Sequence, residues 1–372
     1  MRIGFDAKRA FKNFTGLGNY SRSTIAILAD YYPAHQYYLY TTPYKSHPLL
    51  NFADKENMRI RRPAGRFKCW PSLWRYYGLG GNLSSDRVDL FHGLAAELPA
   101  DLPEKIRSVV TIHDLIFLRY PEYYTFIDRK IYTCKYRSAC RRADLIIAIS
   151  EQTKQDIMEF FGIDEQKIRV VYQGCDPQFY TQADDDAKSR VKELYRLPDN
   201  YVLYVGTIEQ RKNLLSLVKA MELLPPSLKL VAAGKPTSYF HTVQEYIRQR
   251  RLEDRICFQH QVKFADLPAI YQQAQAVCYP SLFEGFGIPL LEALNSRVPL
   301  VASNCSSLPE AGGPDSLYVN PLDHEAIAEA LRKAIEDETT RRQMIEVGIK
   351  FAANFREERV AKNLWKVYQE LM

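Results

Sequence analysis

The chain has few cysteines, no long hydrophobic run and no low-complexity segment. Its seven cysteines are scattered, form no Cys-x-x-Cys pair and lack accompanying histidines, which argues against disulfides and a structural zinc site. No apolar run approaches the ~20 residues that span a bilayer, and residues 1–6 begin a strand rather than a signal peptide. These absences predict a soluble, cytoplasmic protein.

The 372 residues are 46% apolar and 25% charged, enough for a large buried core and more than a single core usually holds. Short apolar segments alternate with helical segments, as in parallel sheets that carry helices on both faces. We therefore predict an α/β fold with two domains. The expected strands are 2–5, 88–91, 109–112, 145–149 and 168–171 in the first half, and 201–205, 228–232, 256–258, 276–279, 300–302 and 317–319 in the second.

Residues 176–200 contain few periodic apolar positions and are predicted to link the two halves. They include the acidic run Asp184-Asp185-Asp186. A carboxylate run that holds a metal under a diphosphate needs the end of a strand, and this run lies in a polar stretch. We interpret it as a solvated acidic run and expect no metal site.

The most informative stretch is residues 280–294, where a glycine-rich turn joins an apolar strand to a helix that begins at Pro289. Glycines let the backbone approach a ligand, and the first turn of a helix favours an anion such as phosphate. Glu284 before the helix and Glu292 within it can accept hydrogen bonds from hydroxyl groups. A nucleotide sugar offers a diphosphate between two hydroxyl-rich groups; the alternative is a plain turn before an amphipathic helix. The turn supplies four candidate donor-binding residues, Gly285, Phe286, Gly287 and Ile288.

Two cations stand at a second junction between a strand and a helix. Arg211 and Lys212 follow the strand 201–205, and Asn213 is predicted to cap the helix that begins at residue 214. Ligands of open α/β sheets bind at the carboxyl ends of the strands. The pair would offset the charge of a departing diphosphate; otherwise both side chains are solvated loop charges.

The pattern around Glu284, Gly285, Gly287, Pro289 and Glu292 closely resembles the signature of retaining glycosyltransferases of family 4, and the resemblance extends along nearly the entire chain. It implies the GT-B fold, two Rossmann-like β/α/β domains whose parallel sheets face each other across a central cleft. The acceptor-binding domain would comprise residues 1–178 plus the returning terminal helix 356–372. The donor-binding domain would comprise residues 179–355.

The resemblance also assigns roles to residues of the first half. His113 follows the strand 109–112 and matches the histidine that lies close to the transferred sugar. Gly16 and Gly18 precede a helix expected from residue 21 and would offer backbone N–H groups to the diphosphate or the acceptor. This Gly-x-Gly lacks the third glycine of a dinucleotide-binding loop, which makes that interpretation less favourable.

In the second half the match departs from the family at two places. Thr207 stands where many relatives carry arginine, so Arg211 would replace the missing cation. Gln261 and Val262 fall in the segment that resembles the base-binding loop, but residues 259–261 lack the glycine-aromatic pair of many relatives. The identity of the base is therefore open.

Together these features imply a retaining, metal-independent transfer of a hexose from a nucleoside-diphosphate sugar to a hydroxyl group of a glycan or lipid-linked oligosaccharide, in cell-surface polysaccharide biosynthesis. The implied catalytic residues are His113, Arg211, Lys212 and Glu284, and no cofactor besides the donor is expected. Residues 206–213 resemble enzymes that use GDP-mannose, which makes mannose the first candidate, with UDP-sugars open. The alternatives are a nucleotide-sugar epimerase on the same fold and a non-catalytic protein that binds a nucleotide sugar or nucleic acid.

Residues 59–77 mix cations with large aromatic side chains in a chain of net charge +6. Such a mixture suits the anionic inner face of a membrane, where charges meet headgroups and rings lie at the interface. It would also suit single-stranded nucleic acid, but the chain has no recognised nucleic-acid module, and a solvated loop is an equal alternative. The residues concerned are Arg59, Arg61, Arg62, Arg66, Lys68, Trp70, Trp74, Arg75, Tyr76 and Tyr77.

Overall fold

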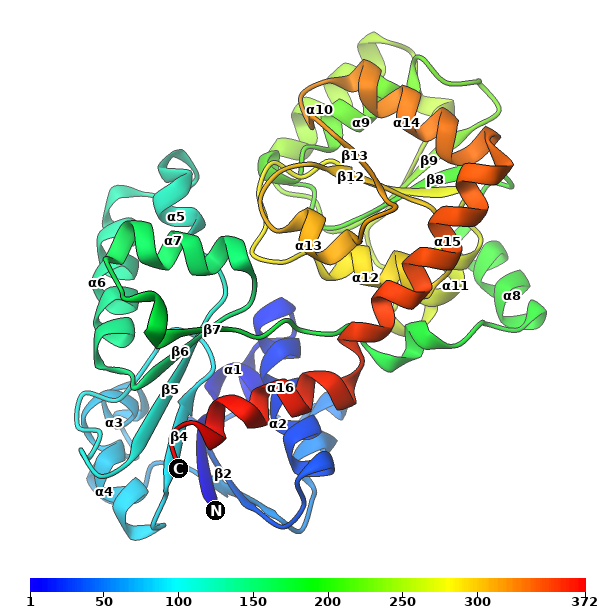
Figure 1. Ribbon diagram of the computed structural model, residues 1–372. Helices are drawn as coiled ribbons and strands as arrows, with labels where there is room; N and C mark the ends of the chain where they lie inside the picture. Colours follow the sequence, from blue (N-terminus) through cyan, green and yellow to red (C-terminus); the bar gives the residue numbers. More distant parts are fainter. The chain divides into compact units, whose positions relative to one another are not determined.

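The computed structural model describes residues 1–372 apart from the side chain of Arg66. The chain divides into two compact units, one of Met1–Gln173 with Glu357–Met372 and one of Gly174–Arg356. Each unit is built on a parallel sheet with helices on both faces (Figure 1). The division falls before the predicted boundary at residue 178 because the segment after Gln173 packs in the second unit, where Asn295 Nδ2 lies 3.3 Å from Cys175 Sγ.

The first unit contains a seven-stranded sheet in the order β3-β2-β1-β4-β5-β6-β7. The strand order reverses at β1, since Ile3 lies opposite both Tyr37 of β2 and Leu90 of β4. In open parallel sheets such a reversal opens a crevice at the carboxyl ends of the strands. The strands are β1 (Arg2–Asp6), β2 (Gln36–Tyr40), β3 (Met58–Arg61), β4 (Leu90–Gly93), β5 (Arg107–Ile112), β6 (Leu145–Ala148) and β7 (Ile168–Val170).

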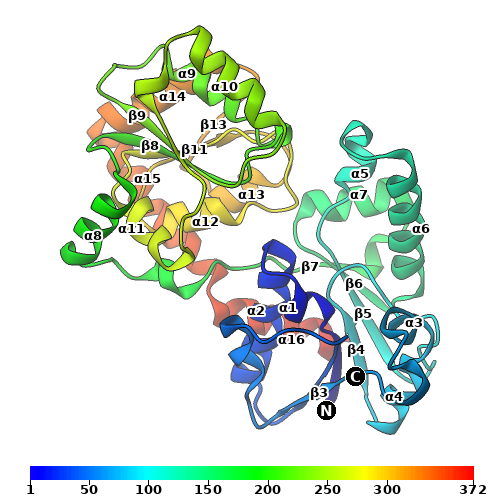
Figure 2. The ribbon, with the colours of Figure 1, turned by 180° about the vertical axis from the view of Figure 1, so that it is seen from behind.

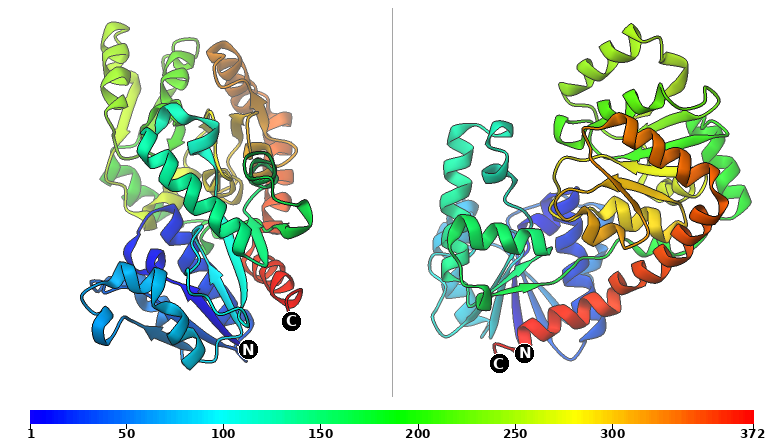
Figure 3. Two further views of the ribbon diagram at one scale, coloured as in Figure 1. Left: turned by 90° about the vertical axis from the view of Figure 1, so that its left-hand side faces the viewer. Right: turned by 45° about the horizontal axis from the view of Figure 1, so that its top comes forward.

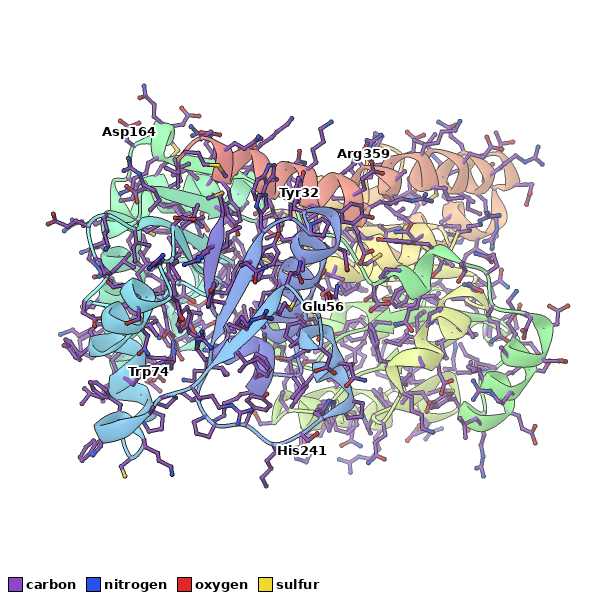
Figure 4. All side chains as sticks on the ribbon, turned by 90° about the horizontal axis from the view of Figure 1, so that it is seen from below. Tyr32, Glu56, Trp74, Asp164, His241 and Arg359 are labelled. Carbon is purple, nitrogen blue, oxygen red and sulfur yellow. The ribbon has the colours of Figure 1, made fainter. Side chains whose placement is uncertain are left out.

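Helices α1, α2 and α16 cover one face of this sheet, and α3 to α7 cover the other (Figures 1 and 2). The terminal helix α16 belongs to this unit because Tyr368 lies 2.6 Å from His92 of β4 and Trp365 stacks on Tyr32 at the end of α2 (Figure 4). The helices are α1 (Lys8–Lys12), α2 (Gly16–Tyr31), α3 (Pro71–Tyr77), α4 (Leu79–Ser85), α5 (Ile116–Arg119), α6 (Phe126–Arg142), α7 (Glu151–Phe161) and α16 (Glu357–Gln369), with 3-10 turns η1 (Pro48–Ala53), η2 (Gly65–Phe67), η3 (Pro121–Tyr123) and η4 (Glu165–Lys167).

The second unit contains a six-stranded sheet in the order β10-β9-β8-β11-β12-β13, with its reversal at β8. Helices α9, α10 and α14 lie on one face, and α8, α11, α12, α13 and α15 lie on the other (Figure 1). The strands are β8 (Tyr201–Val205), β9 (Lys229–Ala233), β10 (Ile256–Gln259), β11 (Ala276–Tyr279), β12 (Leu300–Ser303) and β13 (Leu317–Val319). The helices are α8 (Asp185–Tyr195), α9 (Leu214–Met221), α10 (Tyr239–Gln249), α11 (Leu267–Gln272), α12 (Ile288–Asn295), α13 (Leu308–Gly312), α14 (His324–Glu336) and α15 (Glu338–Ala352), with 3-10 turns η5 (Pro177–Tyr180), η6 (Gln210–Lys212), η7 (Glu253–Arg255), η8 (Phe264–Asp266) and η9 (Ala353–Phe355).

The structure corrects the prediction that residues 176–200 are only a linker. Helix α8 lies within them, and the side chain of Asp184 caps it by accepting a 2.7 Å hydrogen bond from the N–H of Ala187. Val191 is buried, and Arg190 pairs with Asp266 at 2.7 Å, which fastens the helix to the second unit. The acidic run is therefore the start of a helix, where carboxylates favour the positive end of the helix dipole.

Strands β2 and β3 are absent from the predicted set. β2 consists of Gln36–Tyr40 and β3 of Met58–Arg61, so neither has the continuous aliphatic run of a buried parallel strand. β3 is the edge strand of its sheet and can leave arginine side chains in solvent. Within the described residues no helix is both long enough and apolar enough to cross a membrane.

Candidate active site

Three predicted catalytic residues meet at the carboxyl edge of the second sheet. Arg211 and Lys212 belong to η6 after β8, and Glu284 lies in the loop between β11 and α12. Lys212 Nζ lies 2.5 Å from Glu284 Oε1, and Arg211 Nη1 lies 2.9 Å from Glu284 Oε2. Two segments far apart in the sequence thus form one ion-paired cluster.

The Glu284 carboxylate is held by its surroundings and is ionised. Glu284 is 8% exposed, and its Oε1 accepts hydrogen bonds from Ser281 Oγ at 2.6 Å and Tyr279 OH at 3.3 Å. Burial alone would raise the pKa of Glu284, but Lys212 and Arg211 together lower it to about 2. The carboxylate therefore holds both cations at the end of β8.

Both cations keep hydrogen-bond donors that their partners within the cluster do not use. Arg211 donates to the carbonyl of Phe283 at 2.6 Å and to Glu209 at 2.5 Å besides its pair with Glu284. Lys212 donates to Tyr279 OH at 2.6 Å and to Glu284, and an ammonium group has three donor hydrogens. Arg211 has five N–H donors, so both cations keep donor hydrogens for an additional anion.

The turn between β11 and α12 requires glycine at position 287. Gly287 has a φ of +113°, and a Cβ there would lie 2.9 Å from Leu308 Cδ2. Helix α12 begins at Ile288, so Pro289 takes the second position rather than the first. Phe286 is buried, with its ring 5.8 Å from that of Phe355, so the turn can present backbone but not this ring to a ligand. The start of α12 still favours an anion.

Glu292 has a partner outside the cluster. It is 7% exposed on α12, and its Oε2 accepts a 2.8 Å hydrogen bond from Tyr271 OH of α11. Burial raises the pKa of Glu292 to about 7, against the opposing effect of the Tyr271 hydrogen bond. Near neutral pH this carboxyl group can therefore accept from a ligand hydroxyl or donate to it.

Thr207 is exposed in the loop after β8, as a ligand contact requires. The loop is packed closely on the loop after β9, because a Cβ at Gly234 would lie 1.8 Å from the carbonyl oxygen of Gly206. Asn213 does not cap α9 as predicted, since it has a φ of +56° and makes no capping hydrogen bond. Its Nδ2 donates instead to the carbonyls of Pro280 and Pro321 at 3.1 and 2.7 Å, which ties this loop to two others.

Gln261 and Val262 lie in the loop after β10, the first exposed and the second half-buried. The neighbouring His260 places Nδ1 2.9 Å from the carbonyl oxygen of Gly234, and its ring stacks on Phe258. His260 thereby joins the loop after β10 to the loop after β9. The structure records no ion pair or hydrogen bond between them and the Glu284 cluster.

In the first unit, His113 stands at the end of β5 and is 8% exposed. Its Nε2 donates to the carbonyl of Leu94 at 2.9 Å, and its ring meets Tyr20 edge-on at 4.6 Å. Burial lowers the pKa of His113 to about 4, so the ring is neutral at pH 7 and Nδ1 is left as an acceptor. Such a ring can accept a hydrogen bond from a sugar hydroxyl.

Gly16 and Gly18 lie inside the first turn of α2, which begins at residue 16 and not at the predicted residue 21. A Cβ at Gly16 would meet nothing within 4 Å, but one at Gly18 would lie 1.7 Å from the carbonyl oxygen of Asn13. Packing therefore accounts for Gly18. The N–H groups of this turn have no partner within the helix and keep the predicted donor role open.

Residues 59–77, which sequence patterns left open between a membrane contact and a solvated loop, are not exposed throughout. Trp74 of α3 (labelled in Figure 4) is 1% exposed and donates from Nε1 to Asn82 Oδ1 at 2.8 Å. Arg75 pairs with Asp6 at 2.7 Å and with Glu97. Both side chains serve the interior of the unit. Trp70 and Tyr77 remain exposed.

Tyr271, Tyr279 and Ser281 hold the two glutamates, and none of them is among the predicted site residues. Tyr279 and Ser281 lie at the end of β11 beside Glu284, so their place at a strand end was an available signal. Tyr271 lies 21 residues from Glu292 on another helix, and nothing in the spacing indicates their contact. Among the described residues, no group of three or more His, Cys, Asp or Glu side chains is placed to hold a metal ion.

Comparison with known families accounts for both units. The model described as Glycosyltransferase Family 4 matches residues 17–179, and the model described as Glycosyl transferases group 1 matches residues 185–351. The chain belongs to the family 4 glycosyltransferases. The Glu284 cluster thus lies in the half of a family 4 glycosyltransferase that the group 1 model matches, and His113 lies in the other half.

This family 4 glycosyltransferase is similar to three mannosyltransferases of enteric bacteria. It is 29% identical over 287 residues to O-antigen chain mannosyltransferase B of Escherichia coli, covering 76% of this chain and 74% of that protein. It is 28% identical over 231 residues to RfbU of Salmonella typhimurium, covering 62% of each. It is 32% identical over 262 residues to the serotype-specific mannosyltransferase WbdA of Escherichia coli, covering 66% of this chain but 31% of that protein.

Solved structures support the fold. The family 4 glycosyltransferase described here aligns over its whole length with all of Anabaena HepE, solved in complex with UDP and glucose, at a TM-score of 0.78 and 17% identity. It aligns over 99% of both chains with WaaG, a glycosyltransferase involved in lipopolysaccharide biosynthesis, at a TM-score of 0.71 and 16% identity. Its two Rossmann-like units therefore have the architecture of the GT-B class.

Proposed function

We propose that this family 4 glycosyltransferase transfers mannose from GDP-mannose to a hydroxyl group of a glycan or lipid-linked oligosaccharide in cell-surface polysaccharide assembly. The transfer retains the anomeric configuration and needs no metal ion. The observation that carries the proposal is the buried cluster of Arg211, Lys212 and Glu284 beside the turn that opens α12. The names of the O-antigen relatives support mannose as the sugar.

The cluster would stabilise the charge that develops on the departing diphosphate. Lys212 has a donor hydrogen to spare, and the backbone at Gly285, Gly287 and Ile288 adds the positive end of α12. A preorganised donor of this kind contributes about 3 kcal/mol to transition-state stabilisation. Glu284 keeps the cations in place and orients the hydroxyl groups of the sugar. In this mechanism the cations and the helix start supply the charge that a metal supplies elsewhere.

The remaining residues would contact the nucleoside of the donor and the transferred sugar. Glu292 would accept hydrogen bonds from the ribose of the donor, and Gln261 and Val262 would lie against its base. In the first unit, which would bind the acceptor, His113 Nδ1 would accept a hydrogen bond from the transferred sugar. The leaving phosphate would take the proton of the acceptor hydroxyl, and no side chain is assigned as a covalent nucleophile.

The acceptor would reach the enzyme at the inner face of a membrane. Of residues 59–77, Trp70 and Tyr77 are 65% and 60% exposed and are able to touch a lipid surface. Neither residue belongs to the Glu284 cluster, so membrane contact through Trp70 and Tyr77 can be tested without changing the catalytic residues.

A donor screen tests the function. GDP-mannose, UDP-glucose, UDP-galactose and UDP-N-acetylglucosamine would be compared by thermal shift and by release of free nucleoside diphosphate, with EDTA present. We expect GDP-mannose alone to stabilise the protein and to be hydrolysed slowly. Glu284→Ala should lose both effects, and Lys333→Met, an exposed change on α14, should keep them.

Each other outcome changes the proposal. Selective binding of a UDP-sugar would replace the donor and leave the enzyme class intact. Activity only with added divalent metal would contradict metal independence. Conversion of the donor to an epimer without loss of diphosphate would favour the epimerase, and an absence of any response would contradict the proposed donor set.

A further inference from the structure

The first unit contains a small polar cavity that takes no part in the site described above. Its volume is about 160 Å³. It is lined by residues of α3 and α6, two helices on the same face of the first sheet that both face the viewer in Figure 3 (left). Asp6, the last residue of β1, and Glu97, in the loop after β4, also line it. The cavity therefore lies near the carboxyl edge of the sheet, where ligands of open parallel sheets bind.

Four charged side chains line the cavity and pair with one another. Arg75 of α3 donates to Asp6 from Nη2 at 2.7 Å and from Nε at 3.2 Å, and its Nη2 also pairs with Glu97. Lys135 of α6 pairs with the other carboxylate oxygen of Glu97. Lys8 is near enough for Arg75 to add to the effect of burial in lowering its pKa, but Lys8 does not line the cavity. Two carboxylates thus balance two cations in the lining.

The ion pairs leave hydrogen-bonding groups for a ligand. Arg75 Nη1 has no hydrogen-bond partner among the described residues, and Lys135 gives one of its three donor hydrogens to Glu97. Each carboxylate oxygen of Glu97 has one of these cations as its partner and can accept a further hydrogen bond. Because the groups are paired in the order Asp6, Arg75, Glu97, Lys135, acceptors and donors alternate along the chain of ion pairs.

The rest of the lining is mostly apolar. It consists of Ser72, Tyr76, Leu79, Phe91, Leu98 and Pro99. An apolar wall with a few fixed polar groups is typical of a site for a small molecule. At about 30 Å³ per water molecule, the cavity has room for about five waters, which is also the scale of one sugar ring. A sugar ring offers C–H groups to such a wall and hydroxyl groups to the charged side chains.

We propose that this cavity binds one uncharged sugar ring of the acceptor. The hydroxyl groups of the ring would donate to Asp6 and Glu97 and accept from Arg75 and Lys135, while its C–H groups would lie against the apolar wall. The two carboxylates would repel an anionic substituent, and the cations that could offset this repulsion are already paired. The chemistry of the lining therefore selects a neutral sugar over a phosphorylated sugar or a uronic acid.

The loop after β4 connects the cavity with His113. The carbonyl of Leu94 accepts the 2.9 Å hydrogen bond from His113 Nε2, and Glu97 follows three residues later. The N–H of Ala96 donates to the carbonyl of Thr111 at 3.0 Å, which holds the loop against β5. A sugar ring in the cavity would thus lie beside the loop that holds His113. That this ring belongs to the acceptor rests on the proposed function; binding of a neutral sugar to the cavity does not.

Saturation-transfer NMR with the full-length protein tests the binding. The neutral probes are methyl α-mannoside, methyl α-glucoside and methyl α-galactoside at millimolar concentration. We expect wild-type protein to bind at least one of them, and mannose 6-phosphate and glucuronate should not displace it. Glu97→Gln and Lys135→Met should each raise the dissociation constant at least about tenfold, because each removes a charged hydrogen-bonding partner.

Matched variants separate the cavity from other surfaces. Ser72→Trp adds a bulky ring to the lining, changes none of the four charges and should abolish binding. Leu73→Trp adds the same ring at a neighbouring position of α3 that is 45% exposed and does not line the cavity, so it should bind like wild type. Lys130→Met, at an exposed position of α6, is the corresponding control for Lys135→Met. Thermal unfolding of every variant would show that the fold is kept.

The transfer reaction gives a second readout. Release of nucleoside diphosphate from the donor in the absence of acceptor should stay at the wild-type level in Ser72→Trp and Lys135→Met, whereas the KM for a neutral glycan acceptor should rise at least about tenfold. Failure of the donor screen with glycoside binding intact would count against the proposed function and not against the sugar site.

The proposal is overturned if no neutral glycoside binds wild-type protein, or if the anionic sugars displace the bound glycoside. It is also overturned if folded Ser72→Trp, Glu97→Gln and Lys135→Met bind the glycoside like wild type. In that case the four charges only stabilise the first unit.

Discussion

Lys212 is one of the two cations that would stabilise the departing diphosphate in the proposed mechanism. Replacing it by methionine removes the donor that would meet the diphosphate and leaves Glu284 with Arg211 as its only cationic partner. We expect Lys212→Met to lower kcat for sugar transfer about 100-fold, or about 3 kcal/mol. Steady-state kinetics with the donor identified by the screen would measure this.

Two further variants serve as controls for that result. Lys212→Arg keeps the charge and should recover part of the lost rate, and Lys333→Met removes an exposed lysine and should be silent. Wild-type kcat in Lys212→Met would show that the cation plays no part in the departure of the diphosphate.

The raised pKa of Glu292 predicts that donor binding depends on pH. Its raised pKa of about 7 means that the carboxylate able to accept two ribose hydroxyls forms only as the pH rises through neutrality. Donor affinity should therefore increase between about pH 6 and 8 and then level off. Tyr271→Phe removes a hydrogen bond that favours the ionised form, so the rise should move to higher pH.

Isothermal titration calorimetry across that range would follow the affinity. Glu292→Gln should abolish the pH dependence, because the amide does not titrate. An unchanged profile in both Glu292→Gln and Tyr271→Phe would show that another group titrates or that the ribose lies elsewhere.

At the scale of elements, the two glycine-bearing helix starts should respond differently to alanine. Gly287→Ala places a side chain at a φ of +113° and 2.9 Å from Leu308, which should cost about 1–3 kcal/mol and weaken donor binding at the start of α12. Gly18→Ala forces a clash with the backbone of Asn13 and should be destabilising as well. Gly16→Ala meets open space in a helix and should be neutral or slightly stabilising.

Chemical denaturation of the three variants would give these free energies of unfolding. Gly16→Ala is the control for Gly18→Ala, since both lie in the first turn of α2. Equal stability of all three variants would contradict the backbone geometry at both helix starts.

Elements with the strongest local patterns were predicted most accurately. The bounds of β8, β11 and β13 agree with the structure because each is a short apolar run between turn residues. β3 was interpreted as part of a basic segment, because its arginines reach solvent from a sheet edge. α8 was missed because its inward contacts rest on few apolar positions, such as Val191.

For the whole molecule, the two units should change stability in opposite directions as the pH falls from 7 to 5. Burial lowers the pKa of His92 to about 3 and that of His113 to about 4, from 6.5, so below pH 6.5 the unfolded chain binds protons that the folded first unit does not. That unit should lose about 2 kcal/mol per histidine. The pKa of Glu292 is about 7 in the folded chain and 4.5 in the unfolded chain. Its contribution to the free energy of unfolding is therefore present at low pH and is lost as the pH rises.

The second unit should accordingly gain about 2 kcal/mol over the same window. Glu284 does not interfere, because its depressed pKa matters only below about 4.5. Hydrogen exchange, corrected for the intrinsic effect of pH, should show weaker protection of β5 and stronger protection of α12 at pH 5. Parallel changes in both elements, or the same change of α12 in Glu292→Gln, would contradict this account.

The residues alone were enough for the α/β class, the two-domain plan and the likeness to family 4, because strand runs, helix starts and the motif around Glu284 are short-range patterns. They were also enough to bring Arg211 and Lys212 near Glu284, because parallel strands present their carboxyl ends at one edge. Only the tertiary structure decided which side chains are internal. Trp74 donates a hydrogen bond to Asn82, and Arg75 pairs with Asp6 and Glu97. Such partners come from other segments of the chain, so the contacts produce no periodic pattern in the sequence around residues 74 and 75.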